Sequence, residues 1–539
     1  MRCHLRWAAC ILAFVCLSGC AGESNVKRAL DGQILHFGLG AEPQSIDPHL
    51  ANSVSAHNIL TALLEGLVSE DPKTSKPIPG VAERWDISED GTVYVFHFRK
   101  NAKWSNGDSV TAHDFLYSYK RILDPSLGSQ YASMLHILKN AKVFGEGKKT
   151  WEEAEVGVRA LDNLTLELTL ENPVPYFLEQ LNHFTWFPVH PLTIEKFGAR
   201  TTRGTKWTRT GNYVGNGPFI LTEHHVNSVI MVERNPEYWD AAQVRLNGIR
   251  FYPIESVDTE ERAFHSGFLH LTQTVSADRI DSLKKEKPDL IHFEPYLGTY
   301  FYRFNIDEPP FDDIRVRKAM NLAIDRESLV KNVTKGGQQP AVSFTPTNTG
   351  GFTAEPRFKY DVEEAKRLIK EYMDEKGIKE LPPIELKYNT SEGHKKLAVA
   401  MQGMWKKHLG IEMKLLNMEW KVFLATTAKR DFVLARGGWI GDYVDANTFL
   451  HMWRTDDGHN NTGWSNARYD ELLDLAAKET NPVKRFEYFH ECEALLAEEM
   501  PILPIYFYVH VTLRDPSVKG WHPTLLDHHP YQFVYLEED

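Results

Sequence analysis

Residues 310–319 have the sequence PFDDIRVRKA and predict the start of a helix. Asp312 and Asp313 are suited to its N-terminus, because a carboxylate oxygen can accept the free backbone N–H groups of the first turn. The apolar residues that follow recur at helical spacing and are Ala319, Leu322 and Ala323. This stretch therefore predicts a helix with one buried face in the second half of the chain.

Two further helices are predicted toward the C-terminus. Asp361 and Glu364 form a capping-box pattern, and the apolar residues after them are Ala365, Leu368 and Ile369. Beyond Pro482, apolar side chains again recur at helical spacing, at Phe486, Phe489, Cys492, Leu495 and Leu496. Cys492 is therefore predicted to be a core residue of that helix and not a reactive thiol.

Strand patterns precede these helices. Residues 92–98 (TVYVFHF) are rich in β-branched and aromatic side chains. Residues 164–170 (LTLELTL) alternate between apolar and polar types, so one face is predicted to be buried and the other wet. Strands and helices alternate along the chain without an internal repeat, which predicts a mixed α/β architecture.

The N-terminus predicts export. Residues 7–17 form an apolar run that is typical of a signal peptide and too short to cross a bilayer. The run ends in Leu-Ser-Gly-Cys at 17–20, which resembles the lipobox of bacterial lipoproteins. We therefore expect residues 1–20 to be the signal, with a lipidated Cys20, and 21–32 to be a tether. The alternative is ordinary secretion with an unmodified cysteine.

Composition limits the classes of function. The formal net charge is −12 with acidic and basic residues mixed, so no basic patch suggests a nucleic acid partner. Aromatic residues make up 12% of the chain, which suggests an extensive core or an aromatic pocket. Beyond Cys20 only Cys492 remains, so no internal disulfide is possible. A chain of 539 residues is expected to form two or three lobes.

Catalytic and metal-binding motifs are missing from the sequence. It contains no Gly-x-Ser-x-Gly, His-Glu-x-x-His, Walker or Cys-x-x-Cys pattern. The histidine pairs at 224–225 and 528–529 are adjacent, and adjacent side chains in a strand point to opposite faces, so neither pair predicts a chelate. We expect no enzyme activity, no cofactor and no metal. A secreted hydrolase with scattered catalytic residues remains the alternative from another class.

Five collinear segments resemble the solute-binding proteins of peptide ABC importers, the oligopeptide- and dipeptide-binding family. They are 41–49 (AEPQSIDPH), 79–107 with PGVAERW and FRKNAKWSNG, 215–239 with GNGPF and NPEYW, 310–319, and 438–443 (GWIGDY). This resemblance implies a solute-binding lipoprotein that captures short peptides and passes them to permease subunits. It also implies a location outside the cytoplasm, on the periplasmic or outer face of a bacterial membrane, and we expect a monomer.

The resemblance further implies a fold. It is an α/β, three-lobed clamshell like that of periplasmic binding proteins, with mixed sheets and two crossover strands near Leu297 and Tyr508. Ligand would be enclosed between lobes I and III by hinge closure. The expected bounds are 33–66, 191–296 and 508–539 for lobe I, 67–190 for lobe II and 297–507 for lobe III.

Site residues are implied by the same motifs. A peptide's ammonium needs a carboxylate, and Asp442 matches the family position that supplies it. Gly438 and Ile440 match positions that pair through their backbones, and Tyr131 matches a tyrosine over the first side-chain pocket. Arg436 and His394 match positions that receive the peptide carboxylate. The remaining implied lining residues are Asn52, Val54, Tyr296, Trp420, Trp439 and Tyr508.

Some positions depart from the family pattern. Asn52 and Thr427 stand where oligopeptide binders can carry charged side chains, and Thr334 stands where a lysine can serve. The sequence therefore leaves peptide length open, as well as the choice between general peptides and a cell-wall peptide. A nickel chelate or another small solute is a further alternative, although an ammonium-binding carboxylate at Asp442 has no evident role with a nickel chelate.

Overall fold

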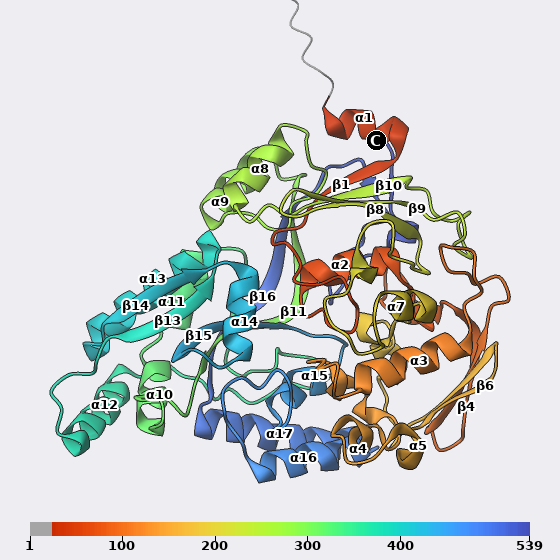
Figure 1. Cartoon of the computed structure of the whole chain (residues 1–539). Coiled ribbons are helices and arrows are strands. Elements are labelled where there is room, and N and C mark those ends of the chain that lie inside the picture. The colour runs from red at the N-terminus through yellow and green to blue at the C-terminus, as the bar shows by residue number, and fades with distance from the viewer. Residues whose placement is uncertain (1–23, 539) are drawn as a thin grey trace, which may run out of the picture.

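The computed structural model describes residues 24–538, which form a mixed α/β structure with three principal sheets (Figure 1). The first sheet has the strand order β1-β10-β9-β8, in which β1 and β10 are parallel and the other pairs antiparallel. Its strands are β1 (Ile34–Gly38), β10 (Gly248–Tyr252), β9 (Val229–Arg234) and β8 (Phe219–His225).

The second sheet contains both strands that the sequence predicts. It is antiparallel, in the order β4-β5-β7-β6. In β7, Leu166 and Leu168 are fully buried while Thr165 and Glu167 are partly exposed, which confirms the alternation. The strands are β4 (Ala82–Ile87), β5 (Val93–Phe98), β7 (Thr165–Thr169) and β6 (Val158–Asp162).

The third sheet has six strands in the order β12-β16-β11-β15-β13-β14. Its pairs are antiparallel as far as β15, whereas β13 runs parallel to both β15 and β14. The strands are β12 (Gln339–Pro340), β16 (Ile502–Leu513), β11 (Ile291–Phe304), β15 (Leu434–Ile440), β13 (Ile384–Asn389) and β14 (Met413–Met418). Two short pairs complete the strands, β2 (Val68–Glu70) with β3 (Pro77–Pro79) and β17 (Val518–Lys519) with β18 (Tyr535–Leu536).

Strands β11 and β16 connect the first sheet with the third. They pair from Ile291 opposite Leu513 to Arg303 opposite Ile502. At the first of these ends, Leu271 bridges both to β1 and to Arg514, directly after β16. Figure 1 shows both strands running from the vicinity of β1 and β10 toward β15. These are the two crossover strands that the resemblance implies.

The helices cover these sheets. In the first half of the chain they are α1 (Asn25–Gly32), α2 (Val54–Leu63), α3 (Ala112–Leu123), α4 (Ala141–Gly145), α5 (Trp151–Ala154), α6 (Phe177–Gln180), α7 (Pro191–Phe197), α8 (Val257–His265) and α9 (Ala277–Glu286). In the second half they are α10 (Ile314–Leu322), α11 (Arg326–Leu329), α12 (Val362–Lys376), α13 (Glu392–Leu409), α14 (Trp420–Ala428), α15 (Asn447–Leu450), α16 (Ala467–Lys478) and α17 (Pro482–Glu499).

The predicted helix starts are confirmed. The Asp313 carboxylate accepts the backbone N–H of Arg315 at the start of α10. At α12 the Asp361 carboxylate accepts the N–H of Glu364. Within α17, Cys492 is fully buried in the apolar core, and this burial raises the pKa of its thiol, as expected for a packing residue.

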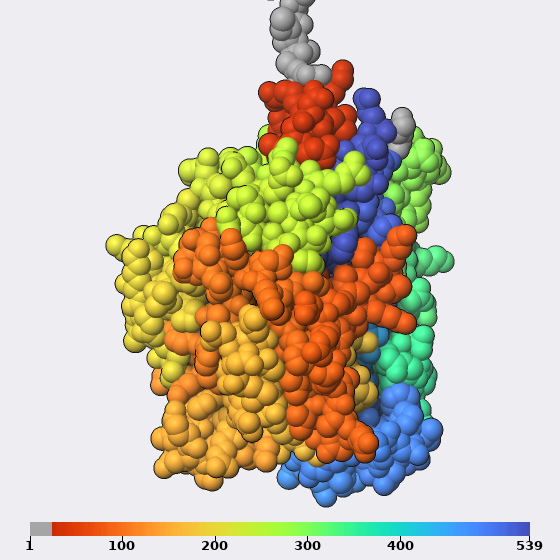
Figure 2. Space-filling model, turned by 90° about the vertical axis from the view of Figure 1, so that its right-hand side faces the viewer, coloured from red at the N-terminus to blue at the C-terminus, as the bar shows by residue number. Residues whose placement is uncertain are grey.

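Apolar packing joins distant parts of the chain. One continuous core links the first and second sheets and also includes Val518, Tyr531, Val534 and Leu536. Figure 2 shows the C-terminal segment, in dark blue, against N-terminal residues in red and orange. The Gln33 amide donates to the carbonyl of Leu536 at 2.8 Å, so the two ends of the described chain are also hydrogen-bonded. Within residues 24–538 no helix combines the length and apolarity that a membrane crossing requires.

Candidate functional site

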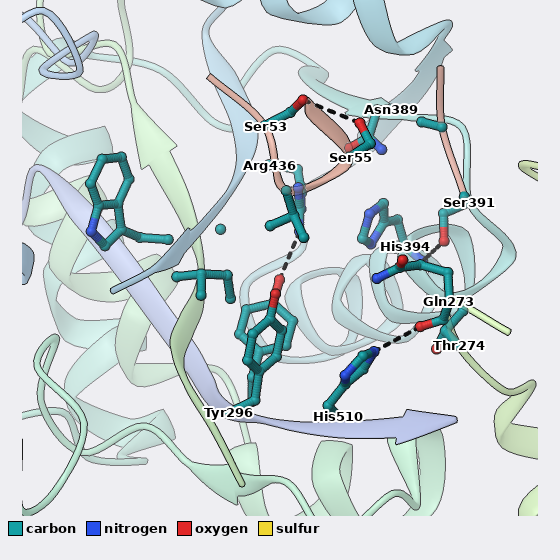
Figure 3. Close-up of a pocket in the computed structure, with 18 of the residues that line it drawn as sticks. Ser53, Ser55, Gln273, Thr274, Tyr296, Asn389, Ser391, His394, Arg436 and His510 are labelled. Atoms are coloured by element: carbon teal, nitrogen blue, oxygen red, sulfur yellow. Dashed lines mark hydrogen bonds between the residues drawn. The ribbon is translucent and has the colours of Figure 1, made fainter. Parts of the chain in front are cut away.

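A cavity of about 560 Å³ lies where β15 and β16 meet α13, α14 and the start of α2. Figure 3 shows Arg436, Tyr296, His394 and His510 around it. The cavity brings together all twelve residues that the sequence singles out: Asn52, Val54, Tyr131, Tyr296, His394, Trp420, Arg436, Gly438, Trp439, Ile440, Asp442 and Tyr508.

Strand β15 presents an open backbone edge to this cavity. On one side it pairs with β11 along its whole length. On the other side it pairs with β13 only at Leu434 and Ala435. From Arg436 to Ile440 no other described strand pairs with this second edge, and these residues line the cavity. An extended chain could therefore add to the sheet at this edge.

The alternation of β15 decides which backbone groups face the cavity. The N–H of Gly441 donates to the carbonyl of Leu297, just before the paired part of β11, at 2.8 Å. In an antiparallel strand, successive residues direct their N–H and C=O groups to opposite edges. Trp439 therefore directs its backbone groups to β11, and Gly438 and Ile440 direct theirs to the open edge.

At one end of the open edge lies the Asp442 carboxylate. Its side chain is only 11% exposed, and its Oδ1 lies 3.3 Å from Nε2 of His183. The Tyr131 hydroxyl donates to the same oxygen at 3.4 Å. The Thr448 hydroxyl accepts the Asp442 backbone N–H at 3.0 Å and donates to its Oδ2 at 3.4 Å. The long contacts to Tyr131, His183 and the Thr448 hydroxyl leave this carboxylate able to accept stronger hydrogen bonds.

At the other end lies the Arg436 guanidinium. It donates to the Tyr508 hydroxyl at 2.8 Å and lies over the Tyr300 ring, 4.8 Å from its centre. Among the described residues no carboxylate lies within ion-pair distance of it, and its Nε has no hydrogen-bond partner. Gly438 leaves room for this arrangement, because a Cβ there would lie 2.7 Å from a guanidinium nitrogen.

His394 lies near Arg436, in the first turn of α13. Its Nδ1 is 3.3 Å from the Tyr300 hydroxyl. Burial, and then the positive charge of Arg436, lower the pKa of His394 well below its usual value. The imidazole is therefore neutral at pH 7, and it can donate one hydrogen bond to a ligand without contributing a charge.

The other predicted residues supply walls. The Tyr296 ring stacks on His510 at 5.1 Å between centres, and the Trp420 ring stacks on Phe423 at 6.2 Å. The amide of Asn52 donates to Gln130 at 2.6 Å. Val54, at the start of α2, adds an apolar surface. The Thr334 and Thr427 side chains also line the cavity and carry no charge.

Residues from the second sheet's part of the chain contact residues that follow β15. The rings of Tyr176 and Tyr443 stack in parallel, 4.5 Å apart. The Ser133 hydroxyl donates to the Asp457 carboxylate at 2.8 Å. Together with the Tyr131–Asp442 contact, these interactions hold the two sides of the cavity together. Ligand exchange therefore requires some of them to separate.

Sequence reasoning missed several lining residues, among them His57, His183, Arg303, His459 and His510. Four are histidines without a motif, so nothing in the sequence distinguishes them. Arg303 did carry a signal, because it is the only charged residue in the aromatic run TYFYRF at 299–304. A charge inside a buried strand indicates either a partner or a ligand.

One group of possible metal ligands occurs among residues 24–538, formed by Glu294, Asp527 and His529. Arg514 already pairs with Glu294 at 2.9 Å, and His510 pairs with Asp527 at 3.0 Å. Two protein cations thus neutralise the carboxylates, so the group is accounted for as a hydrogen-bonded charge network.

Comparisons with known proteins identify the family. The model of the bacterial extracellular solute-binding proteins, family 5 Middle, matches residues 76–461. The periplasmic oligopeptide-binding protein OppA of Salmonella typhimurium is 38% identical over 524 residues, covering 95% of both chains. The structure of Haemophilus influenzae OppA in complex with RPPGFSPFR has a TM-score of 0.89 at 35% identity, covering 94% of this chain and 99% of that one.

The murein tripeptide-binding protein MppA of Escherichia coli shows which conformation is present. One MppA structure gives a TM-score of 0.87 at 33% identity, and its coverage is 94% of this chain and 99% of that chain. The unliganded open form of MppA gives only 0.62 at 34% identity, covering 94% and 98%. The described conformation is thus closer to the peptide complex of OppA than to an open form. The chain belongs to the bacterial extracellular solute-binding proteins of family 5, which are substrate-binding proteins of ABC importers and not enzymes.

Proposed function

We propose that this chain binds short peptides in an extended conformation and delivers them to the permease of an ABC importer. The observation that supports this most is the open edge of β15, which lies between the Asp442 carboxylate and the Arg436 guanidinium. A free peptide carries the complementary groups in the same order: an ammonium, backbone donors and acceptors, and a carboxylate. Pairing along the backbone is independent of sequence, so the side chains can vary.

The spacing of these groups favours three or four residues. The Arg436 guanidinium lies beside Gly438, four positions before Asp442. Four strand residues span about 13 Å, the length of an extended peptide of three to four residues. The neutral His394 can donate a further hydrogen bond to the peptide carboxylate at this end.

A cell-wall peptide is the second candidate. It is favoured by the similarity to MppA, which is named for binding a murein tripeptide, and by the uncharged Asn52, Thr334 and Thr427 in the cavity wall. Calorimetric titration with a murein tripeptide and with Ala-Ala-Ala separates the two. Binding of the murein peptide alone would favour the second candidate, whereas binding of both supports a general peptide receptor.

Attachment to a membrane belongs to the same proposal. Cys20, which lies outside the described residues, would carry lipid and hold the protein next to its permease. A single acyl chain gives only marginal attachment, so a stable anchor needs more than one. Incorporation of labelled palmitate into the protein, and its loss in Cys20→Ala, is the measurement. An unlabelled wild-type protein in membrane fractions would contradict the anchor.

The peptide-binding proposal is tested at Asp442. Asp442→Asn should weaken binding of Ala-Ala-Ala about 30- to 1,000-fold, because a buried ammonium loses its counter-charge at a cost of about 2–4 kcal/mol. N-acetyl-Ala-Ala-Ala has no ammonium, so it should bind the wild type poorly and lose much less affinity in the variant. Calorimetry of both peptides with both proteins isolates the ammonium–carboxylate coupling.

Asp456→Asn is the matched control for this experiment. Asp456 is an exposed carboxylate on the same part of the chain, and it does not line the cavity. Its removal should leave both affinities unchanged. Equal losses for the free and the acetylated peptide in Asp442→Asn would show that Asp442 is structural and would sink the proposed mode of binding.

A further inference from the structure

Arg303 is a second cavity-lining arginine whose charge nothing in the described chain neutralises. It lies on β11 opposite Ala435, and its side chain reaches the cavity. Its Nε is enclosed without a hydrogen-bond partner, and no carboxylate of residues 24–538 lies within ion-pair distance. The guanidinium carbon lies 5.4 Å from the centre of the Phe301 ring.

The charge persists at neutral pH. Burial, and then repulsion by Arg436, lower the pKa of Arg303 to about 10, which still leaves the side chain protonated at pH 7. Two uncompensated guanidinium groups thus line one cavity. A partly buried cation without a counter-ion is unfavourable by itself, so this arrangement favours a ligand that brings its own negative charge.

The two arginines serve different faces of the sheet. Side chains alternate along β15, so Arg436, Gly438 and Ile440 lie on one face and Ala435 and Trp439 on the other. Arg303 stands directly opposite Ala435 in the antiparallel pairing with β11, and opposed residues share a face. Arg303 therefore lies on the Trp439 face, four strand positions or about 13 Å along it. Its guanidinium lies beside the Phe301 ring, and Phe301 stands opposite Gly437, between Ala435 and Trp439. Phe423 of α14, which packs against Ala435, and Thr427 one turn further along α14 complete that side of the cavity.

A bound peptide would alternate in the same way. With its ammonium at Asp442, it runs antiparallel to β15, and its first and third residues lie opposite Ile440 and Gly438. Its second residue lies opposite Trp439 and directs its side chain to the Arg303 face. We propose that Arg303 is a specificity-determining residue that selects peptides with an acidic second residue, by a direct or water-bridged contact to that carboxylate.

This inference rests on the proposed function and is tested with three tripeptides, Ala-Glu-Ala, Ala-Gln-Ala and Ala-Lys-Ala. Glutamine matches glutamate in shape, so the ratio of their affinities measures the charge. Calorimetry should show that the wild type binds Ala-Glu-Ala at least tenfold more tightly than Ala-Gln-Ala and binds Ala-Lys-Ala most weakly. In Arg303→Gln the first ratio should fall to about one, and Arg303→Glu should prefer the lysine peptide.

One control changes the position of glutamate in the peptide, and a second removes a different arginine from the protein. Glu-Ala-Ala and Ala-Ala-Glu place the carboxylate on the other face, so Arg303→Gln should change their affinities less than threefold. Arg468→Gln removes an exposed arginine of α16, which pairs with Glu471 and Glu491 and is not part of the cavity lining. It should leave the preference for Ala-Glu-Ala intact.

The experiment distinguishes a failure of the role of Arg303 from a failure of the proposed peptide binding. If wild type binds Ala-Glu-Ala and Ala-Gln-Ala within twofold of each other, peptide binding stands and the role of Arg303 falls. The same conclusion follows if a folded Arg303→Gln keeps the full preference. Should that variant not fold, the wild-type ratios decide, together with Arg303→Lys, which should keep the preference. If none of the tripeptides binds, the proposed function fails and the inference with it.

Discussion

Buried and partly buried arginines in this molecule differ in what their guanidinium groups bind, and the difference indicates their roles. Arg317 and Arg326 are buried without a carboxylate and donate to backbone carbonyls instead. Arg121 donates to both oxygens of Asp47, at 2.9 and 2.6 Å, and Arg485 binds Asp445 in the same bidentate way. In each pair the carboxylate neutralises the guanidinium and accepts its hydrogen bonds, so the pair stabilises the folded structure around it. Arg436 and Arg303 are both partly buried and line the cavity, and among residues 24–538 neither has such a carboxylate or a hydrogen-bond partner for its Nε. A guanidinium that has neither a carboxylate nor a backbone carbonyl as partner therefore marks the side chains that are available to a ligand.

His510 differs from the two cavity arginines, because its charge is neutralised by a carboxylate, that of Asp527. Its Nδ1 lies 3.0 Å from Asp527, and its Nε2 lies 2.8 Å from the carbonyl of Gln273. Burial alone would lower the pKa of His510, but the charge of Asp527 and the hydrogen bonds outweigh it and raise the pKa to about 9. The imidazolium therefore stabilises the folded state at neutral pH.

This pair predicts a pH-dependent stability. Because the folded-state pKa of His510 is raised, its contribution is complete below pH ~6.5 and is lost as the pH rises toward 9. The full contribution is about 3 kcal/mol. The free energy of unfolding, measured in urea at pH 6.5, 7.5 and 9, should fall more steeply in the wild type than in His510→Gln.

An exposed histidine supplies the control. His225 is 62% exposed beside Glu223, so His225→Gln should keep the wild-type dependence on pH. If His510→Gln loses stability between pH 6.5 and 9 as steeply as the wild type, the ion pair does not set this dependence.

At the scale of elements, the decisive feature is an unpaired strand edge inside the molecule. Exposed edges promote aggregation, and proteins usually cover or shorten them. Here the edge of β15 from Arg436 to Ile440 borders an internal cavity, where other copies of the chain cannot reach it easily. The same backbone groups that would be a liability on the surface become a binding surface in this position.

Gly438 is the residue of this edge most sensitive to substitution. A Cβ there would lie 2.7 Å from a guanidinium nitrogen of Arg436 and 2.8 Å from the Tyr508 hydroxyl. Gly438→Ala should displace the guanidinium and weaken binding of Ala-Ala-Ala about 10- to 100-fold, the cost of one charge-assisted hydrogen bond. Calorimetry measures the affinity, and thermal unfolding should show that the fold is retained.

Gly403→Ala is the matched control, because a Cβ at this α13 position has no neighbour within 4 Å. It should leave affinity unchanged and slightly raise the melting temperature, since alanine favours a helix more than glycine. Unchanged affinity in Gly438→Ala would show that the crowding at this edge is irrelevant to binding.

At the scale of the whole molecule, β11 and β16 are the connection that can transmit closure. Both strands belong to the third sheet and reach the first sheet at Leu271, which bridges β1 and Arg514. The contacts between the second sheet's part of the chain and the residues after β15 include side-chain contacts such as Tyr176–Tyr443 and Ser133–Asp457. Breaking such side-chain contacts costs less free energy than breaking the backbone hydrogen bonds of a continuous sheet. Opening by a hinge in these strands is therefore the expected motion.

Peptide should shift the population toward the closed form, because only that form contacts the ligand from both sides. Small-angle scattering should give a larger radius of gyration for the peptide-free protein than for the protein saturated with a binding peptide. The closed conformation described here should reproduce the second curve. Identical curves with and without a peptide that calorimetry shows to be bound would contradict hinge closure.

The sequence by itself determined the family, the α/β class and the identity of many elements. Motifs such as GWIGDY at 438–443 are local strings, and alternation or helical spacing is set by neighbouring residues, so both can be recognised without coordinates. Asp313 and Asp361 cap their helices for the same local reason. All twelve singled-out residues line one cavity, although their roles, and the bounds of the three lobes, stay predictions.

Only the tertiary structure decided which charges are neutralised and which are not. Asp47 and Arg121 lie 74 positions apart and satisfy each other, whereas Arg303 has no carboxylate partner among residues 24–538, and no pattern in the sequence separates these cases. The open edge of β15 also depends on where β13 stops pairing. Electrostatic compensation and strand pairing act between residues that are close in space and distant in sequence, so they appear only once the chain is folded.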